Sequence, residues 1–237
     1  MEELKRLAML VGWENIEKLR NTNIAVFGIG GVGGYVCEAL SRSGVGHFTL
    51  VDHDTVSLSN INRQIIALHS TVGRVKVEVM KERMLDIDPS LEIKTYPIFV
   101  NEETISQFDF SEYDYVIDCI DTVSAKLQLI EECHKVGTPI ICSMGTGNKL
   151  DPKGLEITVL EKTQNCPLAK IMRSECRKRG FHKVEVLYSP ASAIKPLFDD
   201  SDSGKRGPLG SSAFVPSSAG LMLASYVVRN IVREEVK

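Results

Sequence analysis

Residues 23–44 read NIAVFGIGGVGGYVCEALSRSG, and this stretch decides the fold. Its first five residues form an apolar run that glycines interrupt at once, a pattern typical of a buried parallel strand. The glycine-rich residues 28–34 then lead into a segment with helical periodicity, which Gly44 ends. A strand, a glycine-rich turn and a helix in direct succession are the context in which a G-x-G-x-x-G motif binds phosphate.

Strand and helix patterns alternate from this stretch through residue 143. Such alternation predicts an α/β fold with a doubly wound, mostly parallel sheet, a Rossmann-like domain with a C-terminal extension. The crossovers should be right-handed, and a functional site should lie at the carboxyl ends of the strands. The pattern predicts helices at 1–20, 71–88, 123–136 and 217–233, and further strands at 47–52, 91–96, 114–119, 139–144, 154–162 and 184–189.

The whole chain, residues 1–237, is expected to form a single domain. Within it, residues 163–216 form a basic segment and a flexible loop inserted before the C-terminal helix. Residues 189–212 are rich in Pro, Ser, Gly and Asp and carry few apolar side chains. We interpret them as a mobile loop and a candidate lid.

Composition excludes several classes of protein. The formal net charge of −3 provides no global field toward nucleic acid or a membrane, so any nucleic-acid contact needs a local patch. The longest apolar stretch, near the C-terminus, is shorter than the roughly 18 residues that a membrane span needs. The charged N-terminus lacks the apolar core of a secretory signal. Six cysteines without a C-x-x-C pair indicate free thiols in a reducing compartment, so we expect a cytoplasmic protein.

The glycine-rich turn predicts a nucleotide site. Gly28 should allow the tight turn, Gly30 should let the backbone approach phosphate, and Gly33 should let the helix pack on the strand. Gly31 lies within the same motif. Asp52 ends the second predicted strand, where an acid can accept hydrogen bonds from ribose hydroxyls. These features fit NAD, FAD or ATP.

The segment that follows Asp52 favours ATP. A hydride-transferring dehydrogenase needs only the ribose acid here and has no use for Asn60, Arg63 and Lys76 together. The planar guanidinium of Arg63 can neutralise phosphate, and Lys76 supplies a compact charge for the same task. Asn60 can bridge a ribose or phosphate oxygen without adding charge. A surface Arg or Lys taken alone is more often simply solvated, so the argument depends on the whole set.

Two carboxylates lie at the end of the fourth predicted strand, in the segment IDCIDT, residues 117–122. They are Asp118 and Asp121. Mg²⁺ is usually held by one or two carboxylates plus phosphates, so a carboxylate beside the crevice is a candidate metal ligand. For Asp118, capping of the following helix is an equally simple explanation.

The motifs GIGGVG, DHD, SNINRQ, VGRVK and IDCIDT resemble, in order and spacing, the adenylation domain of the ubiquitin-activating-enzyme superfamily. The resemblance covers roughly residues 1–160 and implies a single ATP-binding adenylation domain that uses Mg²⁺. The implied catalytic residues are Arg63, Lys76 and Asp121, and Asp121 is the implied metal ligand. The implied nucleotide-binding residues are Gly28, Gly30, Gly31, Gly33, Asp52, Asp54, Asn60, Arg63, Lys76 and Asp121.

The same resemblance implies a homodimer. Members of the superfamily are homodimers or pseudodimers, and an N-terminal arginine of one subunit often reaches the ATP of the other. Arg6 is the nearest candidate in this sequence.

Within the superfamily, the chain resembles the bacterial tRNA threonylcarbamoyladenosine dehydratases. The resemblance lies in GIGGVGGYVCEALSRSGVG, NINRQIIALHSTVGRVKVEVM and CPLAKIMRSECRKRG. It implies a tRNA substrate whose threonine carboxylate is adenylated and then cyclises with net loss of water. The alternative is an activator of a ubiquitin-like sulfur-carrier protein, against which the missing C-x-x-C pairs count. A nucleotide-sensing module without turnover and a plain NAD dehydrogenase are weaker alternatives.

A basic segment would suit a tRNA substrate, since phosphate neutralisation dominates nucleic-acid binding. Between residues 170 and 183, Glu175 is the only acid among six cations, although a solvated helix face is an equally good interpretation. Cys166 precedes Pro167 at a predicted helix start, where packing is favoured over a sulfur-relay or thioester role. The six candidate nucleic-acid contacts are Lys170, Arg173, Arg177, Lys178, Arg179 and Lys183.

Overall fold

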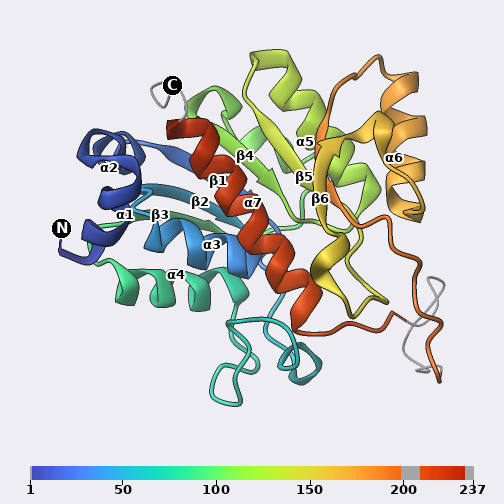
Figure 1. Cartoon of the computed structure of the whole chain (residues 1–237), viewed down its shortest axis with the longest axis horizontal. Coiled ribbons are helices and arrows are strands. Elements are labelled where there is room, and N and C mark those ends of the chain that lie inside the picture. The colour runs from blue at the N-terminus through green and yellow to red at the C-terminus, as the bar shows by residue number, and fades with distance from the viewer. Residues whose placement is uncertain (1, 199–208, 233–237) are drawn as a thin grey trace.

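The described strands form one seven-stranded sheet in the order β3-β2-β1-β4-β5-β7-β6, which lies behind α7 in Figure 1. A computed structural model describes residues 2–198 and 209–232. Neighbouring strands are parallel except β6 and β7, so the predicted mostly parallel sheet is confirmed. The strands are β1 (Asn23–Phe27), β2 (His47–Val51), β3 (Glu92–Tyr96), β4 (Tyr115–Asp118), β5 (Ile140–Ser143), β6 (Glu156–Val159) and β7 (Glu185–Tyr188).

The central strand β1 explains why the sheet is covered on both faces. Successive side chains of a strand point to opposite faces. Ile24 and Val26 belong to the core on one face, and Ala25 and Phe27 belong to the core on the other. A strand buried on both faces must be apolar at every position, which is the pattern in its sequence.

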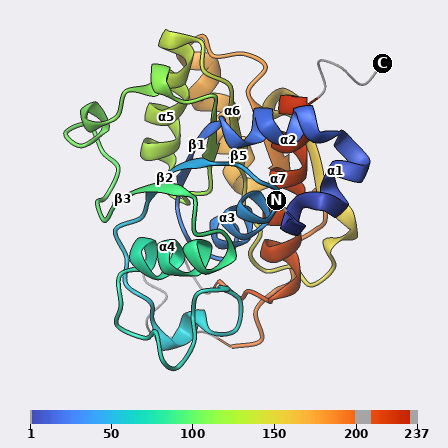
Figure 2. The same cartoon turned by 90° about the vertical axis from the view of Figure 1, so that its left-hand side faces the viewer.

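Helices form a layer on each side of the sheet. Figure 2 shows α5 (Val123–Val136) and α6 (Pro167–Lys178) above the sheet, with α3 (Gly33–Arg42) and α4 (Lys76–Ile87) below it. On the lower side α7 (Phe214–Val232) packs along α3. The other helices are α1 (Lys5–Val11), α2 (Trp13–Arg20) and the 3₁₀ turns η1 (Glu2–Leu4), η2 (Leu58–Asn60), η3 (Ile105–Gln107), η4 (Phe110–Glu112), η5 (Pro152–Gly154) and η6 (Leu160–Lys162).

Two predicted helices have different boundaries in the structure. The expected helix at 1–20 is divided at Gly12, whose φ of 83° leaves the helical region. The expected helix at 71–88 begins only at Lys76, because Val75 is extended and forms an isolated antiparallel bridge with Thr55. The start of α4 is thereby held beside the end of β2.

The C-terminal third completes the same sheet. Segment 163–216 contributes α6 and β7, and β7 lies between β5 and β6. The expected strand at 154–162 is shorter, since β6 ends at Val159 and continues as η6. Of the predicted loop at 189–212, residues 199–208 lie outside the described part of the chain. The last predicted helix is found as α7, which starts three residues earlier than expected.

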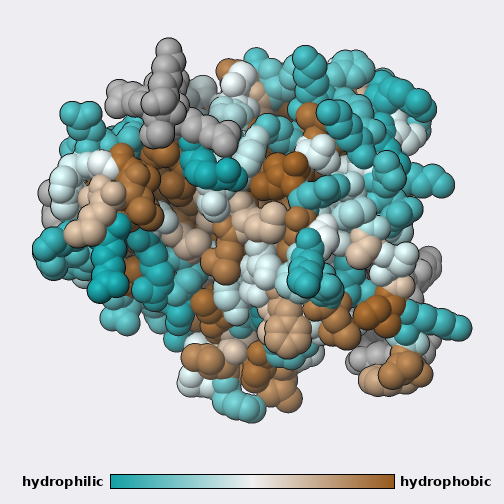
Figure 3. Space-filling model, viewed as in Figure 1, coloured by the Kyte–Doolittle hydropathy of each residue, from teal (hydrophilic) through white to brown (hydrophobic). Residues whose placement is uncertain are grey.

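The face shown in Figure 3 is uneven in hydropathy. Hydrophobic side chains gather over α7 and toward the lower edge, whereas the surface over α5 and α6 is mostly hydrophilic. Within residues 2–198 and 209–232, no helix combines the length and the apolar character that a bilayer crossing requires.

Candidate active site

The carboxyl ends of β1, β2 and β4 border a cavity of about 350 Å³. This volume lies within the range of small-ligand pockets. The position agrees with the general location of ligands in open α/β sheets, beyond the carboxyl ends of the strands. All ten residues expected at the nucleotide contribute to the structure of this region, and nine of them line the cavity: Gly28, Gly30, Gly31, Asp52, Asp54, Asn60, Arg63, Lys76 and Asp121.

The tenth residue, Gly33, supports the cavity from behind. A Cβ atom at this position would lie 1.8 Å from the Gly28 carbonyl oxygen, so no other residue fits without moving the backbone. Gly28 itself has a φ of 91°, and its N–H donates to the Val51 carbonyl at 2.7 Å. The loop therefore turns tightly from β1 into α3. The partial positive charge of the α3 N-terminus is directed at the cavity that the loop lines.

Asp52 holds the glycine loop against the end of β2. One carboxylate oxygen accepts the Ile29 N–H at 2.6 Å, and the other accepts the Asp54 N–H at 2.9 Å. The carboxylate lines the cavity while it is anchored by two backbone donors. Its remaining lone pairs suit hydroxyl donors such as those of a ribose.

The two expected phosphate-binding cations enter the cavity from different elements. Lys76 is the first residue of α4, and its side chain is only 6% exposed. Its ammonium donates to Asp54 at 2.7 Å. The Arg63 guanidinium donates to the Ser59 carbonyl at 2.8 Å, and burial lowers the pKa of this side chain. Both cations are thus held in place by protein oxygens before any anion binds.

A neighbouring amide, Gln64, was missed by the sequence reasoning although it lies within the quoted SNINRQ motif. Gln64 is buried and lines the cavity, and its Oε1 has no hydrogen-bond partner among the described residues. A buried acceptor without a donor is costly, so this oxygen is suited to a ligand donor. Asn60, by contrast, uses its Oδ1 to accept the Ser57 N–H at 3.1 Å, which stabilises η2.

The two carboxylates at the end of β4 have different environments; Asp118 is the last residue of the strand, and Asp121 follows it. Asp121 is exposed and lines the cavity. Asp118 is completely buried and accepts from the Lys126 ammonium at 2.8 Å. The Mg²⁺ and helix-capping explanations for Asp118 are therefore both wrong, and the α5 N-cap is Thr122.

The Asp118–Lys126 pair fixes the turn that carries Asp121. The second oxygen of Asp118 accepts the Ile120 N–H at 3.0 Å, and Lys126 also donates to the Ser143 carbonyl at 2.7 Å. Burial lowers the pKa of Lys126, but the adjacent Asp118 carboxylate outweighs it and raises the pKa overall. The pair joins the ends of β4 and β5 beneath the cavity.

A set of ligand atoms on the cavity rim has the spacing of a metal site. Those of Asp52, His53 and Asp54 lie within 4.8 Å of one another. The Asp52 carboxylate anchors the glycine loop, and the Asp54 carboxylate accepts from Lys76. Asp121 is the carboxylate whose position and exposure fit a cation shared with phosphate oxygens.

The opposite wall is apolar and also escaped the sequence reasoning. Ile98, Phe99 and Val100 form it together with Ala125, and the ring centroids of Phe99 and His53 lie 4.9 Å apart in an edge-to-face arrangement. A flat apolar surface of this kind suits a nucleobase. No spacing pattern marked residues 98–100, because they lie in the irregular segment after β3, whereas Ala125 belongs to α5.

A further part of the rim comes from the C-terminal half. The Asn148 N–H donates to the Gly210 carbonyl at 2.7 Å, and the Asn62 amide donates to the Ser211 carbonyl at 2.9 Å. These bonds place Leu209 and Ser211 on the cavity lining. The described end of the predicted 189–212 loop therefore contacts the site.

Cys166 and Cys176, the N-cap residue of α6 and a residue within it, are both buried. Cys166 is 5% exposed and belongs to the core between α5 and α6. Burial raises the pKa of the Cys176 thiol to about 11. A thiol is a poor nucleophile under these conditions, because the thiolate is the reactive form.

The basic segment is divided between two faces of α6. Lys178 and Arg179 both pair with Glu175 at 2.6 Å. Lys170, Arg173 and Arg177 line a second cavity. The sixth expected cation, Lys183, is exposed in the turn before β7.

Comparison with known proteins gives three findings. A model of the ThiF family matches residues 4–236. The chain is 42% identical over 248 aligned residues to the tRNA threonylcarbamoyladenosine dehydratase of Bacillus subtilis, with 100% of this chain and 98% of that protein covered. The crystal structure of Escherichia coli tRNA N6-threonylcarbamoyladenosine dehydratase in complex with ATP matches with a TM-score of 0.89 and 31% identity, covering 98% of this chain and 95% of that one.

A fourth match is shorter. The molybdopterin-synthase adenylyltransferase of Haemophilus influenzae is 32% identical over 176 residues, which cover 74% of this chain and 70% of that protein.

Proposed function

Because this chain belongs to the ThiF family, we propose that it is an ATP-dependent tRNA threonylcarbamoyladenosine dehydratase. It adenylates the threonine carboxylate of threonylcarbamoyladenosine in tRNA and promotes cyclisation of the activated nucleoside. The resemblance inferred from the motifs is confirmed by the family match and by the full-length relative.

The observation that carries the proposal is the extent of the similarity. The Bacillus subtilis dehydratase matches the whole chain, including α6 and α7, whereas the molybdopterin-synthase adenylyltransferase matches 74% of it. The match over the whole chain therefore favours the dehydratase over the adenylyltransferase. Activation of a sulfur-carrier protein, with a sulfur-relay partner, is the weaker alternative, and the buried Cys166 gives it no support.

The cavity provides what adenylation requires. A carboxylate is a poor electrophile, because its charge repels nucleophiles and oxide is a poor leaving group. A carboxylate oxygen attacks the α-phosphorus of ATP, pyrophosphate leaves, and an acyl adenylate forms. A nucleophile of the same nucleoside then attacks the acyl carbon and displaces AMP, which carries away the carboxylate oxygen. The second step is favoured by the high effective concentration of an intramolecular nucleophile.

The protein contributes positioning and charge. The apolar wall at Phe99 receives adenine, Asp52 accepts from the ribose, and the glycine loop faces the phosphates. Lys76 and Arg63 neutralise the negative charge that accumulates around the α-phosphorus. No enzyme nucleophile is needed, in agreement with the thiol of Cys119, which lines the cavity but whose pKa is raised by burial.

Asp121 would hold Mg²⁺ with the help of phosphate oxygens and water. The fit depends on its carboxylate at the cavity rim, held there by the Asp118–Lys126 pair beneath it. When bound, the ion supplies Lewis-acid stabilisation of charge on the phosphates.

The enzyme acts as a homodimer in the cytoplasm. Exposed apolar side chains on α1 (Met9 and Leu10) and on α7 (Phe214 and Leu221) support association with a second copy. Arg6, which is exposed on α1, then reaches the ATP of the partner. Free thiols and a tRNA substrate both suit the cytoplasm.

The test is turnover with matched tRNAs. Purified protein, ATP and Mg²⁺ are incubated with tRNA that carries threonylcarbamoyladenosine and, separately, with unmodified transcript. AMP and pyrophosphate should form only with the modified tRNA, and the nucleoside should lose the mass of one water. AMP formation with a carrier protein ending in Gly-Gly, and none with modified tRNA, would transfer the assignment to the alternative.

A further inference from the structure

A second cavity, of about 460 Å³, lies beside α6 and is called the α6 cavity below. Its floor is apolar and contains Leu160, Phe181 and Val184. The Leu160 N–H donates to the Val184 carbonyl at 2.8 Å, at the position where β7 begins. The α6 cavity therefore lies at the amino end of β7, whereas the nucleotide site lies at the carboxyl ends of the parallel strands.

Three cations of one helix face line the α6 cavity. Lys170, Arg173 and Arg177 are spaced i, i+3 and i+7, so their side chains lie in one row along α6. The single carboxylate in the lining is Glu161, whose oxygen already accepts the Lys183 N–H at 2.8 Å. The lining thus has a clear positive excess.

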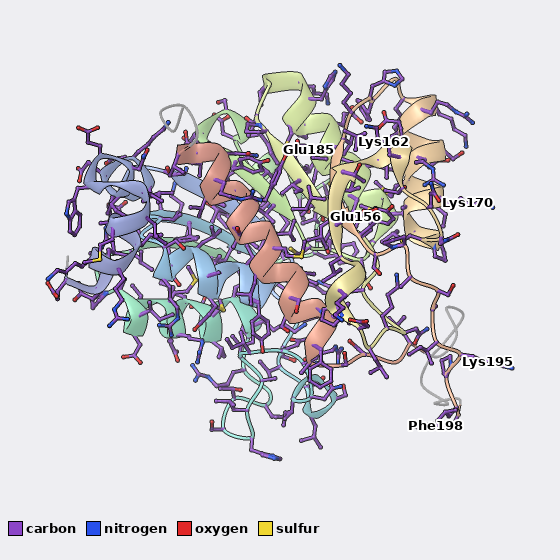
Figure 4. All side chains as sticks on the ribbon, in the orientation of Figure 1. Glu156, Lys162, Lys170, Glu185, Lys195 and Phe198 are labelled. Atoms are coloured by element: carbon purple, nitrogen blue, oxygen red, sulfur yellow. The ribbon has the colours of Figure 1, made fainter. Side chains whose placement is uncertain are left out.

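Two of these cations are available to an anion. Lys170 and Arg177 are exposed and have no ion-pair partner among the described residues. Figure 4 shows Lys170 at the outer edge of the molecule, extending from α6 away from the sheet. Lys178 and Arg179 differ, because both are neutralised in part by Glu175.

Arg173 is held in place rather than exposed. Its guanidinium donates to the Thr163 carbonyl at 2.6 Å and also to the Thr163 hydroxyl. The guanidinium is thereby fixed in the cavity wall. Phe181 lines the same cavity, and its ring centroid lies 5.5 Å from that of His134 in an edge-to-face arrangement. Guanidinium planes and aromatic rings are the surfaces on which proteins stack unpaired bases, and cations beside them contact phosphates.

We propose that the α6 cavity is a docking site for the tRNA substrate, in which an unstacked nucleotide contacts Phe181 while Lys170 and Arg177 bind the neighbouring phosphates. This inference rests on the proposed function. A concave site of small-ligand size with an aromatic floor fits a nucleotide better than the flat surface of a protein partner. The four residues of β7 span about 13 Å between the amino ends of the strands, where the α6 cavity lies, and the carboxyl ends, where the nucleotide site lies. The docked nucleotide is therefore remote from the reacting adenosine.

Remote docking has a specific kinetic consequence. A contact that stabilises the bound substrate and the transition state equally affects only binding, so its loss raises KM and leaves kcat unchanged. The variant Lys170→Gln with Arg177→Gln should therefore raise the KM for modified tRNA at least tenfold, with kcat and the KM for ATP unaltered. The slope of log Kd for labelled tRNA against log salt should fall by about two, one for each phosphate contact removed.

The matched control removes the same charge at the C-terminal end of α6. Its two residues were candidate contacts in the sequence, but both pair with Glu175 and neither lines the cavity. Lys178→Gln with Arg179→Gln also eliminates two cations, and its KM for tRNA should stay within threefold of the wild type. If both double variants raise the KM for tRNA equally, the proposed docking site is wrong and only a general effect of charge remains. An unchanged tRNA affinity in the cavity variant, with lost binding of an acidic carrier protein, would replace RNA by a protein partner.

The two proposals fail in different ways. Wild-type turnover of modified tRNA tests the proposed function alone. If the wild type forms AMP and the cavity variant is indistinguishable from the control, the docking site is wrong and the dehydratase function stands. If the wild type forms no AMP with any tRNA, the function is wrong, whatever the variants do.

Discussion

Replacement of Lys76 by Met removes the buried ammonium from the nucleotide cavity while keeping most of the side-chain volume. We expect kcat/KM for AMP formation to fall by about 10²–10³-fold, because one preorganised charge at the reacting phosphate is worth about 2.7–4 kcal/mol. This estimate agrees with the interaction of two unit charges 4 Å apart at an effective dielectric constant of 20, which is about 4 kcal/mol.

The fold should lose much less. The Lys76 ammonium lies 2.7 Å from Asp54, whose side chain is 50% exposed, so water screens the pair. Such a partly exposed pair contributes at most about 1 kcal/mol to stability. In a chain of 237 residues this corresponds to a fall in Tm of about 2–4 °C. The large kinetic loss and the small thermal loss together distinguish a phosphate-binding cation from a structural one.

The assay measures AMP release with saturating modified tRNA and varied ATP, and calorimetry gives Tm for the same preparations. Lys81→Met, on the same helix α4 but outside the cavity lining, is the control and should retain wild-type activity. An activity within fivefold of the wild type for Lys76→Met would refute the role of this ammonium. A fall in Tm of more than about 10 °C would show that its role is structural.

Three further changes test the fold around the site. Lys126→Met leaves the completely buried Asp118 carboxylate without its partner and should cost about 3–5 kcal/mol in urea unfolding; a cost below 1 kcal/mol would contradict the buried pair. Gly33→Ala brings a Cβ onto a carbonyl oxygen 1.8 Å away and should abolish ATP binding in calorimetric titration or prevent folding; normal binding would contradict the contact. Burial raises the pKa of the Glu38 carboxyl, but hydrogen bonds from Arg83 and Arg42 lower it overall. The ionised carboxylate therefore stabilises the fold at pH values above the unfolded pKa of about 4.3, and this stabilisation is lost as the pH falls through the lower folded pKa. The stability difference between wild type and Glu38→Gln should accordingly shrink between pH 6 and pH 3, and a difference independent of pH would refute the ion pair.

The sequence was sufficient for the sheet because the determining interactions are local. β1 is apolar at every buried position and is followed directly by glycines, one of which, Gly33, admits no side chain. The direction of the edge strand β6 was harder to predict. Nothing in residues 154–162 reports that β6 runs antiparallel to β7, since that depends on which strand it meets after the intervening α6.

Asp118 and Asp121 show where local patterns stop being sufficient. Both are acids that directly follow an apolar run, so the same rule treated them alike. Their environments are decided by residues outside the segment IDCIDT: Lys126 comes from the first turn of α5, and the Ser143 carbonyl comes from β5. The Lys126 ammonium donates to both the Asp118 carboxylate and the Ser143 carbonyl, so the charged end of β4 can be buried. The chain then turns outward within three residues. Asp121 reaches the cavity rim for that reason. A carboxylate at the rim therefore depends on a second carboxylate and a lysine that never contact the ligand, and sequence spacing alone does not distinguish the two acids.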